Sequence, residues 1–238
     1  MRSKQLDLTK YSTDKIESQY LIRYDSILEP WINQNIVLLE LGVYQGESLL
    51  LWRDYFPRST IVGVDIKLPK DFNPPDRVFL FEGSQTDTKF LSSIANEIAP
   101  DGLDIIIDDA SHIGEFTKIA FWHLFDHHLK ANGLYIIEDW GTGYWDDWVD
   151  GKSLNLDSYL ERPSGLSTVW ANIKRRLGIK IPAKSHSYGM VGLIKQLVDE
   201  QAAHDITRKK LGGKSRRGSK FDHIIIAPSL VFIKKAAQ

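Results

Sequence analysis

The segment 37–47 constrains the fold more than any other part of the sequence. It reads V-L-L-E-L-G-V-Y-Q-G-E, in which an apolar run contains the acid Glu40 and is followed by Gly42, Gly46 and a segment of helical pattern. A strand, a glycine turn and a helix form the opening unit of a nucleotide-binding α/β fold. In the dinucleotide fingerprint G-x-G-x-x-G the middle glycine lets the backbone approach a pyrophosphate. Tyr44 takes that place here, so we expect pyrophosphate binding to be disfavoured. A plain turn with two glycines is the alternative, because short glycine motifs often match by chance.

Length and composition limit the class of protein. A chain of 238 residues suits one α/β domain with insertions, so we expect a single domain over 1–238. The formal net charge of −1 gives no general attraction to nucleic acid or membranes, and the lack of cysteine excludes disulfides and thiol nucleophiles. No apolar run approaches the roughly 20 residues of a membrane span, and the first residues lack the apolar core of a signal peptide. We therefore expect a cytoplasmic protein.

Strands and helices are expected to alternate along the chain. Apolar runs predict strands at 36–41, 60–66, 77–82, 103–109 and 134–137, with helices at 47–55, after 87 to about 98, and at 114–130. A further helix is expected at 190–205 and two closing strands at 221–235. This order predicts a parallel sheet with helices on both faces, and a closing hairpin makes the last strand antiparallel.

Three details of the helices can be predicted from their patterns. Residues 1–35 are expected to form a helical cover over one end of the sheet, with N-caps at 12–14 and a stop at Pro30. The helix 114–130 is expected to bury one apolar stripe and to end at a C-cap. The stripe comprises Phe116, Ala120, Phe121, Leu124 and His128, and the C-cap is Asn132–Gly133. The helix 190–205 is expected to bury Met190, Ile194, Leu197 and Val198 on one face.

Acids gather where the expected strands end. They are Glu40, Asp65, Asp108, Asp109, Glu138 and Asp139. Ligands of open α/β sheets bind beyond the carboxyl ends of the strands. Asp65 follows Gly46 by 19 residues, close to the roughly 20 at which an acid meets a ribose diol. A surface aspartate at a strand end is the alternative for Asp65.

Four of the polar residues predict a cation site with a base. Asp109, Glu138 and Asp139 lie at neighbouring strand ends, where like charges either raise a pKa or require a cation. Mg²⁺ prefers such oxygen ligands. His112 follows Asp109 by three residues, and an imidazole kept neutral by a nearby cation can act as a general base. The alternative is that Asp108 caps the next helix, His112 is an ordinary turn residue, and the two later acids are solvated.

Several motifs carry a resemblance to known enzymes. The acid-x-G-x-x-x-G pattern of 40–46 resembles motif I of class I S-adenosylmethionine (SAM) methyltransferases. D-D-A-S-H at 108–112 and I-I-E-D-W-G-T-G-Y-W at 136–145 resemble the metal-dependent sugar O-methyltransferases of macrolide and aminocoumarin antibiotic biosynthesis, the mycinamicin, tylosin and novobiocin type. T-D-K at 13–15, G-S-Q-T-D at 83–87 and S-L-V-F-I-K-K at 229–235 match as well, so the resemblance covers most of the chain. Ser12 and Ile16 stand where the family usually has glycines beside T-D-K.

The resemblance implies a fold, two cofactors and a set of roles. It implies a Rossmann-like, seven-stranded methyltransferase sheet with the first, fourth and fifth strands side by side. It implies that Asp109, Glu138 and Asp139 hold Mg²⁺ and that His112 removes the proton from a sugar hydroxyl. The expected SAM-binding residues are Thr13, Glu40, Gly42, Tyr44, Gly46, Ser48, Asp65, Ser84, Gln85 and Asp108, with Ser84 and Gln85 beside the adenine. A side chain added at Gly42 is expected to project into the cofactor.

Two segments have no clear counterpart in this pattern. Residues 140–187 are rich in tryptophan and are expected to form a lid, a substrate-binding insertion or a contact in a homo-oligomer. Tyr144, Trp145 and Trp148 have the apolar faces and polar edges that stack on sugars, although packing within the lid is an equal alternative. The basic, glycine-rich loop 208–220 is expected to be a solvated flexible connector, with contact to nucleic acid as the lesser alternative.

The sequence thus favours a SAM- and Mg²⁺-dependent O-methyltransferase. Its partner is expected to be a small-molecule acceptor, a sugar or glycoside with vicinal hydroxyls, rather than a membrane or a nucleic acid. A metal-independent SAM methyltransferase acting on another small molecule is one alternative. A non-catalytic nucleotide-binding or RNA-binding protein is the other, and His112 argues against it because a binding module needs no base.

Overall fold

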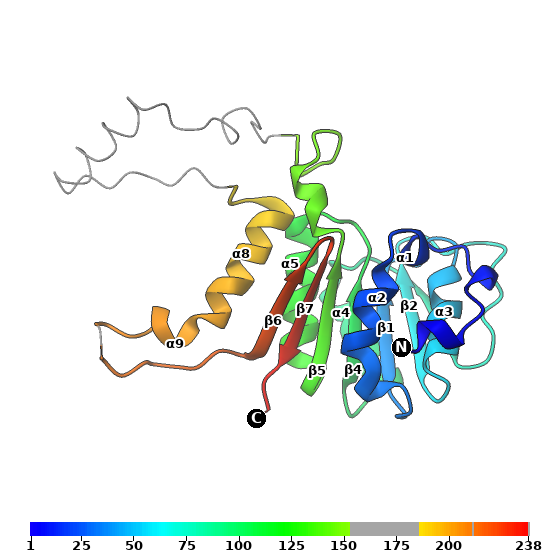
Figure 1. Cartoon of the computed structure of the whole chain (residues 1–238), viewed down its shortest axis with the longest axis horizontal. Coiled ribbons are helices and arrows are strands. Elements are labelled where there is room, and N and C mark those ends of the chain that lie inside the picture. Colours follow the sequence, from blue (N-terminus) through cyan, green and yellow to red (C-terminus); the bar gives the residue numbers. More distant parts are fainter. Residues whose placement is uncertain (153–185, 211, 238) are drawn as a thin grey trace.

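A seven-stranded mixed sheet organises the molecule (Figure 1). The computed structural model describes residues 1–152, 186–210 and 212–237. The strand order is β3-β2-β1-β4-β5-β7-β6, and β7 runs antiparallel to both of its neighbours while the first five strands are parallel. The strands are β1 (Val37–Leu41), β2 (Thr60–Asp65), β3 (Val78–Glu82), β4 (Leu103–Asp108), β5 (Leu129–Glu138), β6 (Phe221–Ala227) and β7 (Leu230–Lys235). This topology confirms the methyltransferase sheet and the adjacency of strands one, four and five.

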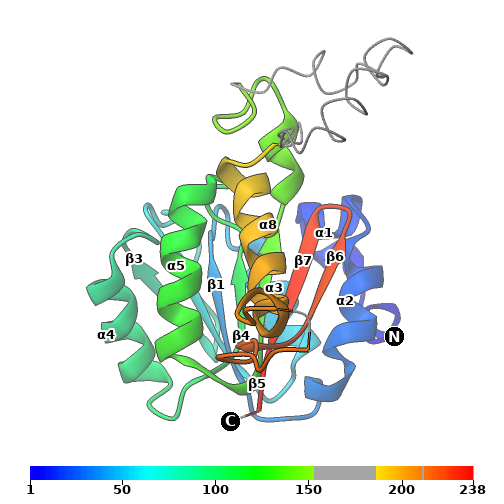
Figure 2. The same cartoon turned by 90° about the vertical axis from the view of Figure 1, so that its left-hand side faces the viewer.

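Helices cover both faces of the sheet, as Figures 1 and 2 show. The α-helices are α1 (Asp14–Glu17), α2 (Tyr20–Leu28), α3 (Glu47–Tyr55), α4 (Thr88–Ile98), α5 (Gly114–His127), α8 (Gly189–Gln201) and α9 (Ala203–Ile206). Short 3₁₀ helices span Ser3–Gln5, Leu8–Lys10, Glu29–Trp31 and Trp140–Tyr144. One apolar core joins the sheet to α2 and α3, and the other joins it to α4, α5 and α8.

The two cores follow from the two-residue period of a strand. Along β1, Leu38 belongs to the core under α2 and α3, whereas Leu39 and Leu41 belong to the core under α4, α5 and α8. Because β1 is central, its side chains are covered on both faces. Trp52 of α3 and Tyr24 of α2 are fully buried and meet edge to face with ring centroids 5.0 Å apart.

The N-terminal cover differs from the single helix that the sequence predicts. Gln19 adopts a left-handed conformation with φ of 58°, which ends one helix and lets the chain start another in a new direction. The cap at Thr13 is confirmed, since its side chain accepts a hydrogen bond from Lys15 N at the start of α1. The break sends α1 toward the strand ends and lays α2 against the face of the sheet (Figure 1).

The prediction for the helix after His112 was wrong at its end and in part of its stripe. α5 ends at His127, and the chain enters β5 at once because Leu129 pairs with Leu103 of β4. Asn132, with φ of 61°, therefore lies at an irregularity inside β5 and caps no helix. Phe116 is 43% exposed, and the buried face of α5 runs through Thr117, Ala120, Phe121, Leu124 and Phe125. On α8, Val198 is likewise exposed, while Met190, Ile194 and Leu197 are buried as expected.

Only part of the insertion 140–187 can be described, because 153–185, including Trp170, lie outside the described residues. Asp150 fastens the described part to two helices, since its Oδ2 accepts hydrogen bonds from Gly114 N of α5 and Met190 N of α8, both at 2.8 Å. The basic loop is anchored rather than free, because Arg217 pairs with Glu200 of α8 and the Lys220 side chain pairs with Asp126 of α5. Across the described residues, none of the helices has the length and apolar character needed to span a bilayer.

Candidate active site

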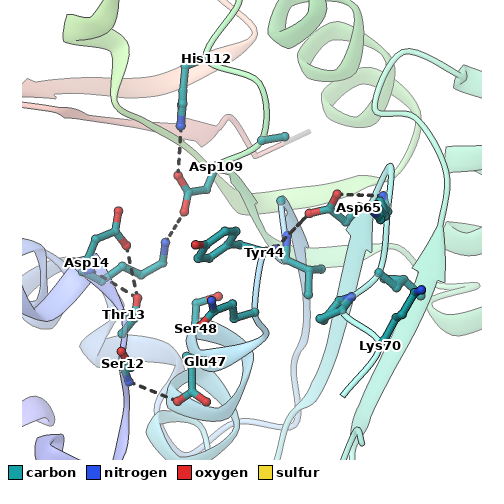
Figure 3. Close-up of a pocket in the computed structure, with 18 residues that line it drawn as sticks. Ser12, Thr13, Asp14, Tyr44, Glu47, Ser48, Asp65, Lys70, Asp109 and His112 are labelled. Carbon is teal, nitrogen blue, oxygen red and sulfur yellow. Dashed lines mark hydrogen bonds and ion pairs between the residues drawn. The ribbon is translucent and has the colours of Figure 1, made fainter. Parts of the chain in front are cut away.

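A cavity of about 730 Å³ opens at the carboxyl ends of β1 and β2, beside the N-terminal segment 12–15 (Figure 3). Five of the expected cofactor-binding residues line it, namely Thr13, Gly42, Tyr44, Ser48 and Asp65. Asp109 and His112 line it as well. The cavity therefore brings half of the expected cofactor residues and the expected base together in one space.

Asp65 shapes the loop that borders this cavity. Its Oδ2 accepts hydrogen bonds from Val43 N at 2.7 Å and Tyr44 N at 3.1 Å, and its Oδ1 accepts one from Lys67 N at 3.1 Å. The Tyr44 side chain is 81% exposed and lies between Asp109 and Asp65 in Figure 3. The acid that ends β2 thus holds the turn after β1 in place and still borders the cavity.

Gly42 is required for a reason other than the one expected. A Cβ added there would lie 2.1 Å from the backbone oxygen of Asp109, and Gly42 has φ of +94°. The side chain would therefore collide with the turn after β4 and not project into a cofactor.

Five expected cofactor residues do not line the cavity. They are Glu40, Gly46, Ser84, Gln85 and Asp108. Asp108 is buried on the α4 and α5 face of the sheet, where Gln85 Nε2 and the Tyr135 hydroxyl donate to it at 3.3 and 3.2 Å. Burial raises the pKa of Asp108 to about 6. Asp108 does not cap α5, whose first backbone amide, Gly114 N, is bonded by Asp150.

Lys15 is a buried cation at this site, and no role for it was predicted from the sequence. Its side chain is 0% exposed, and its Nζ lies 2.6 Å from Asp109 Oδ2, 3.0 Å from Glu138 Oε1 and 3.3 Å from Glu40 Oε1. Burial by itself lowers the pKa of Lys15, yet the three carboxylates outweigh burial and hold that pKa well above its usual range. The signal for Lys15 in the sequence was the T-D-K motif at 13–15, because its lysine can supply a cation to the acids at the strand ends.

The geometry of the strands explains why these acids meet Lys15. Glu40 lies opposite Ile107 in the sheet, and Ile107 lies opposite Ile136, so these residues point to the same face. Asp109 follows Ile107 by two residues just after β4, and Glu138 follows Ile136 by two residues at the end of β5. All three acids therefore project toward the α2 and α3 face. The Tyr24 hydroxyl of α2 donates to Glu138 Oε1 there at 2.5 Å.

A second group of side chains surrounds His112. One ligand atom each from Asp109, His112 and Asp139 lie within 4.8 Å of one another. His112 Nε2 is 3.8 Å from Asp109 Oδ1 and 3.9 Å from Asp139 Oδ2 (Figure 3 shows the contact to Asp109). Trp148 packs beside this histidine, since its Nε1 donates a hydrogen bond to His112 O at 3.3 Å and the two ring centroids are 5.8 Å apart. The sequence predicted that Trp148 either stacks on a sugar or packs within the lid or an oligomer contact, and it predicted no contact with His112.

The donor set of these acids fits a divalent cation. One oxygen of each expected ligand is engaged: Asp109 Oδ2 by Lys15, Glu138 Oε1 by Lys15 and Tyr24, and Asp139 Oδ1 by the Tyr20 hydroxyl. The remaining oxygens of Asp109 and Asp139 face His112 beyond hydrogen-bond distance. Glu138 Oε2 is buried and has no hydrogen-bond partner among the described residues. Such a buried acceptor is costly unless something binds it.

Burial governs the charge of these carboxyl groups. Removal from water raises the pKa of Asp109 and of Glu138, and the Lys15 ammonium opposes this rise at both. A cation beyond Lys15 would stabilise both ionised forms. Glu138 belongs with Glu40 and Asp109 in one close group, whereas Asp139 belongs with Asp109 and His112 in the other. Asp109 is common to the two groups.

Known proteins resemble this chain in sequence and in fold. No family model matches it. It is 39% identical over 129 residues to the mycinamicin VI 2''-O-methyltransferase of Micromonospora griseorubida, covering 51% of this chain and 31% of that protein. It is 34% identical over 185 residues to the L-olivosyl-oleandolide 3-O-methyltransferase of Streptomyces antibioticus, covering 67% and 47%. The structure of the MycE methyltransferase in complex with Mg and SAH matches with a TM-score of 0.67 at 26% identity, covering 90% of this chain and 49% of MycE.

These matches confirm the resemblance to the sugar O-methyltransferases and the class I methyltransferase fold. The chain spans about half the length, or less, of these three proteins.

Proposed function

We propose that this protein is a SAM- and Mg²⁺-dependent O-methyltransferase that methylates a hydroxyl of a sugar on a glycosylated small molecule. The observation that carries the proposal is the shared wall of the cavity. Asp109 and His112 line the same 730 Å³ space as Thr13, Ser48 and Asp65. A methyl donor in that space would lie next to a base. The relatives, which are named as sugar O-methyltransferases of natural products, support the choice of acceptor.

SAM supplies an activated methyl group. Asp65 lines the cavity 19 residues after Gly46, where an acid can accept hydrogen bonds from a ribose. The hydroxyls of Thr13 and Ser48 line the same cavity and can hold polar groups of the donor. Tyr44, in place of a glycine, leaves a side chain where a pyrophosphate would need close backbone approach. These residues therefore favour SAM over a dinucleotide.

Asp109, Glu138 and Asp139 would hold the metal, since each offers an oxygen that no other described group binds as a hydrogen-bond donor. A divalent ion there supplies Lewis acidity, which lowers the pKa of an acceptor hydroxyl. A hard cation held by these oxygen ligands would suit an oxygen-rich acceptor, such as a sugar with vicinal hydroxyls.

His112 is positioned to receive the proton. Its Nε2 is the atom that faces Asp109 and Asp139, and both carboxylates would stabilise the imidazolium once the proton has moved there. Trp148 donates a hydrogen bond to the backbone carbonyl oxygen of His112, and its ring lies 5.8 Å from the imidazole, so Trp148 packs beside the His112 ring. General-base catalysis of this kind contributes about 10²–10⁴ in rate.

One observation favours a second candidate, a metal-independent methyltransferase. Lys15 already neutralises part of the charge of Glu40, Asp109 and Glu138. If that ammonium suffices for the site, methyl transfer needs no metal. The two candidates share the cavity and the base and differ in the response to a chelator.

The test is a methyl-transfer assay with glycosides that carry vicinal hydroxyls. The protein is incubated with SAM and each acceptor, and S-adenosylhomocysteine (SAH) and the methylated product are both measured. We expect turnover that EDTA removes and Mg²⁺ restores, and a loss of about 10²–10⁴ in kcat for His112→Ala with SAM binding retained. His204→Ala is the control, because His204 is an exposed histidine on α9. Full turnover in excess EDTA selects the metal-independent candidate, and full turnover of His112→Ala rejects the base.

A further inference from the structure

The N-terminal segment Thr13–Tyr24 sends three side chains into the acidic site. Lys15 comes from α1, and Tyr20 and Tyr24 come one helical turn apart from α2. All three are almost completely buried, with Lys15 and Tyr24 at 0% exposure and Tyr20 at 6%. Each ends in a hydrogen-bond donor next to a carboxylate of another element.

Each expected metal ligand receives at least one of these donors, and Glu138 Oε1 lies beside both Lys15 and Tyr24. Lys15 Nζ bonds Asp109 Oδ2 at 2.6 Å, the Tyr24 hydroxyl bonds Glu138 Oε1 at 2.5 Å, and the Tyr20 hydroxyl bonds Asp139 Oδ1. In each of these carboxylates one oxygen accepts a hydrogen bond from the N-terminal segment, and the other oxygen accepts none from it. A carboxylate bonded at one oxygen can rotate little, so the position of its second oxygen is fixed.

We infer that Lys15, Tyr20 and Tyr24 are positioning residues that orient the second oxygens of Asp109, Asp139 and Glu138 toward a divalent cation. The inference rests on the proposed function, because it assigns these residues to the same metal site. It gives the N-terminal cover a role in the chemistry beyond closing one end of the sheet. None of the three touches the reacting atoms; each acts through a carboxylate.

The electrostatics of the site agree with this role. A tyrosine hydroxyl that faces a carboxylate in a buried place stays protonated, and burial followed by the bonded acid raises the pKa of both Tyr20 and Tyr24. The hydroxyls are therefore donors throughout the ordinary pH range. A neutral donor holds a carboxylate without cancelling its charge, so the Tyr20 hydroxyl leaves Asp139 its attraction for a cation.

Removal of single hydroxyls tests the inference with little loss of packing. Tyr20→Phe and Tyr24→Phe each delete one donor and keep the ring. Tyr55→Phe is the matched control, because the Tyr55 hydroxyl is a buried donor to Asp25, 2.8 Å away and outside the site. Binding of Mn²⁺ to the full chain is measured by electron paramagnetic resonance, which gives the concentration of free Mn²⁺. SAH affinity and the melting temperature are measured in parallel.

We expect Tyr20→Phe and Tyr24→Phe to bind Mn²⁺ about 10–100-fold more weakly than wild type, the range usual for groups that orient metal ligands. SAH affinity should stay within about twofold, and Tyr55→Phe should bind Mn²⁺ like wild type. If either tyrosine variant fails to fold, the other carries the test. Unchanged Mn²⁺ affinity in a folded variant that still binds SAH overturns the inference and leaves the proposed function intact. A wild-type protein that binds SAH but no Mn²⁺ overturns both the inference and the metal part of the proposed function.

Discussion

Replacement of Lys15 by methionine is the sharpest perturbation of the site. The side chains have similar length, so Lys15→Met removes the ammonium while filling much of the same space. Three buried carboxylates then lose a cation that lies 2.6, 3.0 and 3.3 Å from them. Breaking a buried ion pair by removing one partner costs about 3–5 kcal/mol. That loss is a large share of the roughly 5–15 kcal/mol that stabilises a typical domain.

The loss should depend on pH in a definite direction. Burial raises the pKa of Glu40, Asp109 and Glu138 in the folded state, and Lys15 opposes the rise at each of them. Without Lys15 these folded-state pKa values rise further above those of the unfolded chain. A raised carboxyl pKa favours the folded state at low pH and disfavours it as pH rises through that pKa. The deficit of Lys15→Met should therefore be larger at pH 8 than at pH 5.5.

Urea unfolding in the presence of EDTA, followed by fluorescence at both pH values, measures this deficit. Lys130→Met is the matched control, because Lys130 pairs with Asp104 at 2.9 Å but is 35% exposed, and such pairs contribute about 1 kcal/mol or less. If Lys15→Met costs no more than Lys130→Met, or if its deficit grows as pH falls, the description of Lys15 as the buried counter-ion of three acids is incorrect.

Three further results are expected. Gly42→Ala should lower the melting temperature by several degrees, because its Cβ would lie 2.1 Å from Asp109 O and strained backbone costs about 1–3 kcal/mol; an unchanged melting curve would contradict the contact. Burial lowers the pKa of His128, so wild type should lose stability as pH falls from 7 to 5 and His128→Gln should lose less, as urea titrations at the two pH values would reveal. Arg217→Ala should cost up to about 1 kcal/mol through its half-exposed pair with Glu200, while calorimetry should find SAH affinity within about twofold, and a larger loss would place the basic loop at the cavity.

The sheet could be predicted from the sequence because local pattern and global fold agree there. Each apolar run between residues 36 and 138 became a strand, and the acids at their ends mark the edge at which the cavity lies. The helix break at Gln19 could not be predicted, since neither glycine nor proline marks it. The prediction of a helix C-cap at Asn132–Gly133 failed although the pair is typical of a helix end. Leu129 already pairs with Leu103 in the sheet, so the helix ends before this pair is reached.

Only part of the site could be predicted from the sequence. His112 and the acids could be found because they lie in short motifs near strand ends. Tyr20 and Tyr24 of α2 could not, because their partners lie 119 and 114 residues away and meet them only in the folded chain. The acids at the strand ends predicted a metal ion, but two of them, Asp109 and Glu138, also pair with the ammonium group of Lys15.

A crystal structure of the protein grown with SAH and Mn²⁺ tests the central claim most directly. We expect SAH in the cavity bordered by Thr13, Tyr44 and Asp65, and an anomalous peak for Mn²⁺ bound by oxygens of Asp109, Glu138 and Asp139. SAH bound elsewhere would contradict the assignment of the cavity. SAH in the cavity without an anomalous peak at these acids would contradict the metal site and leave Lys15 as the cation of the active site.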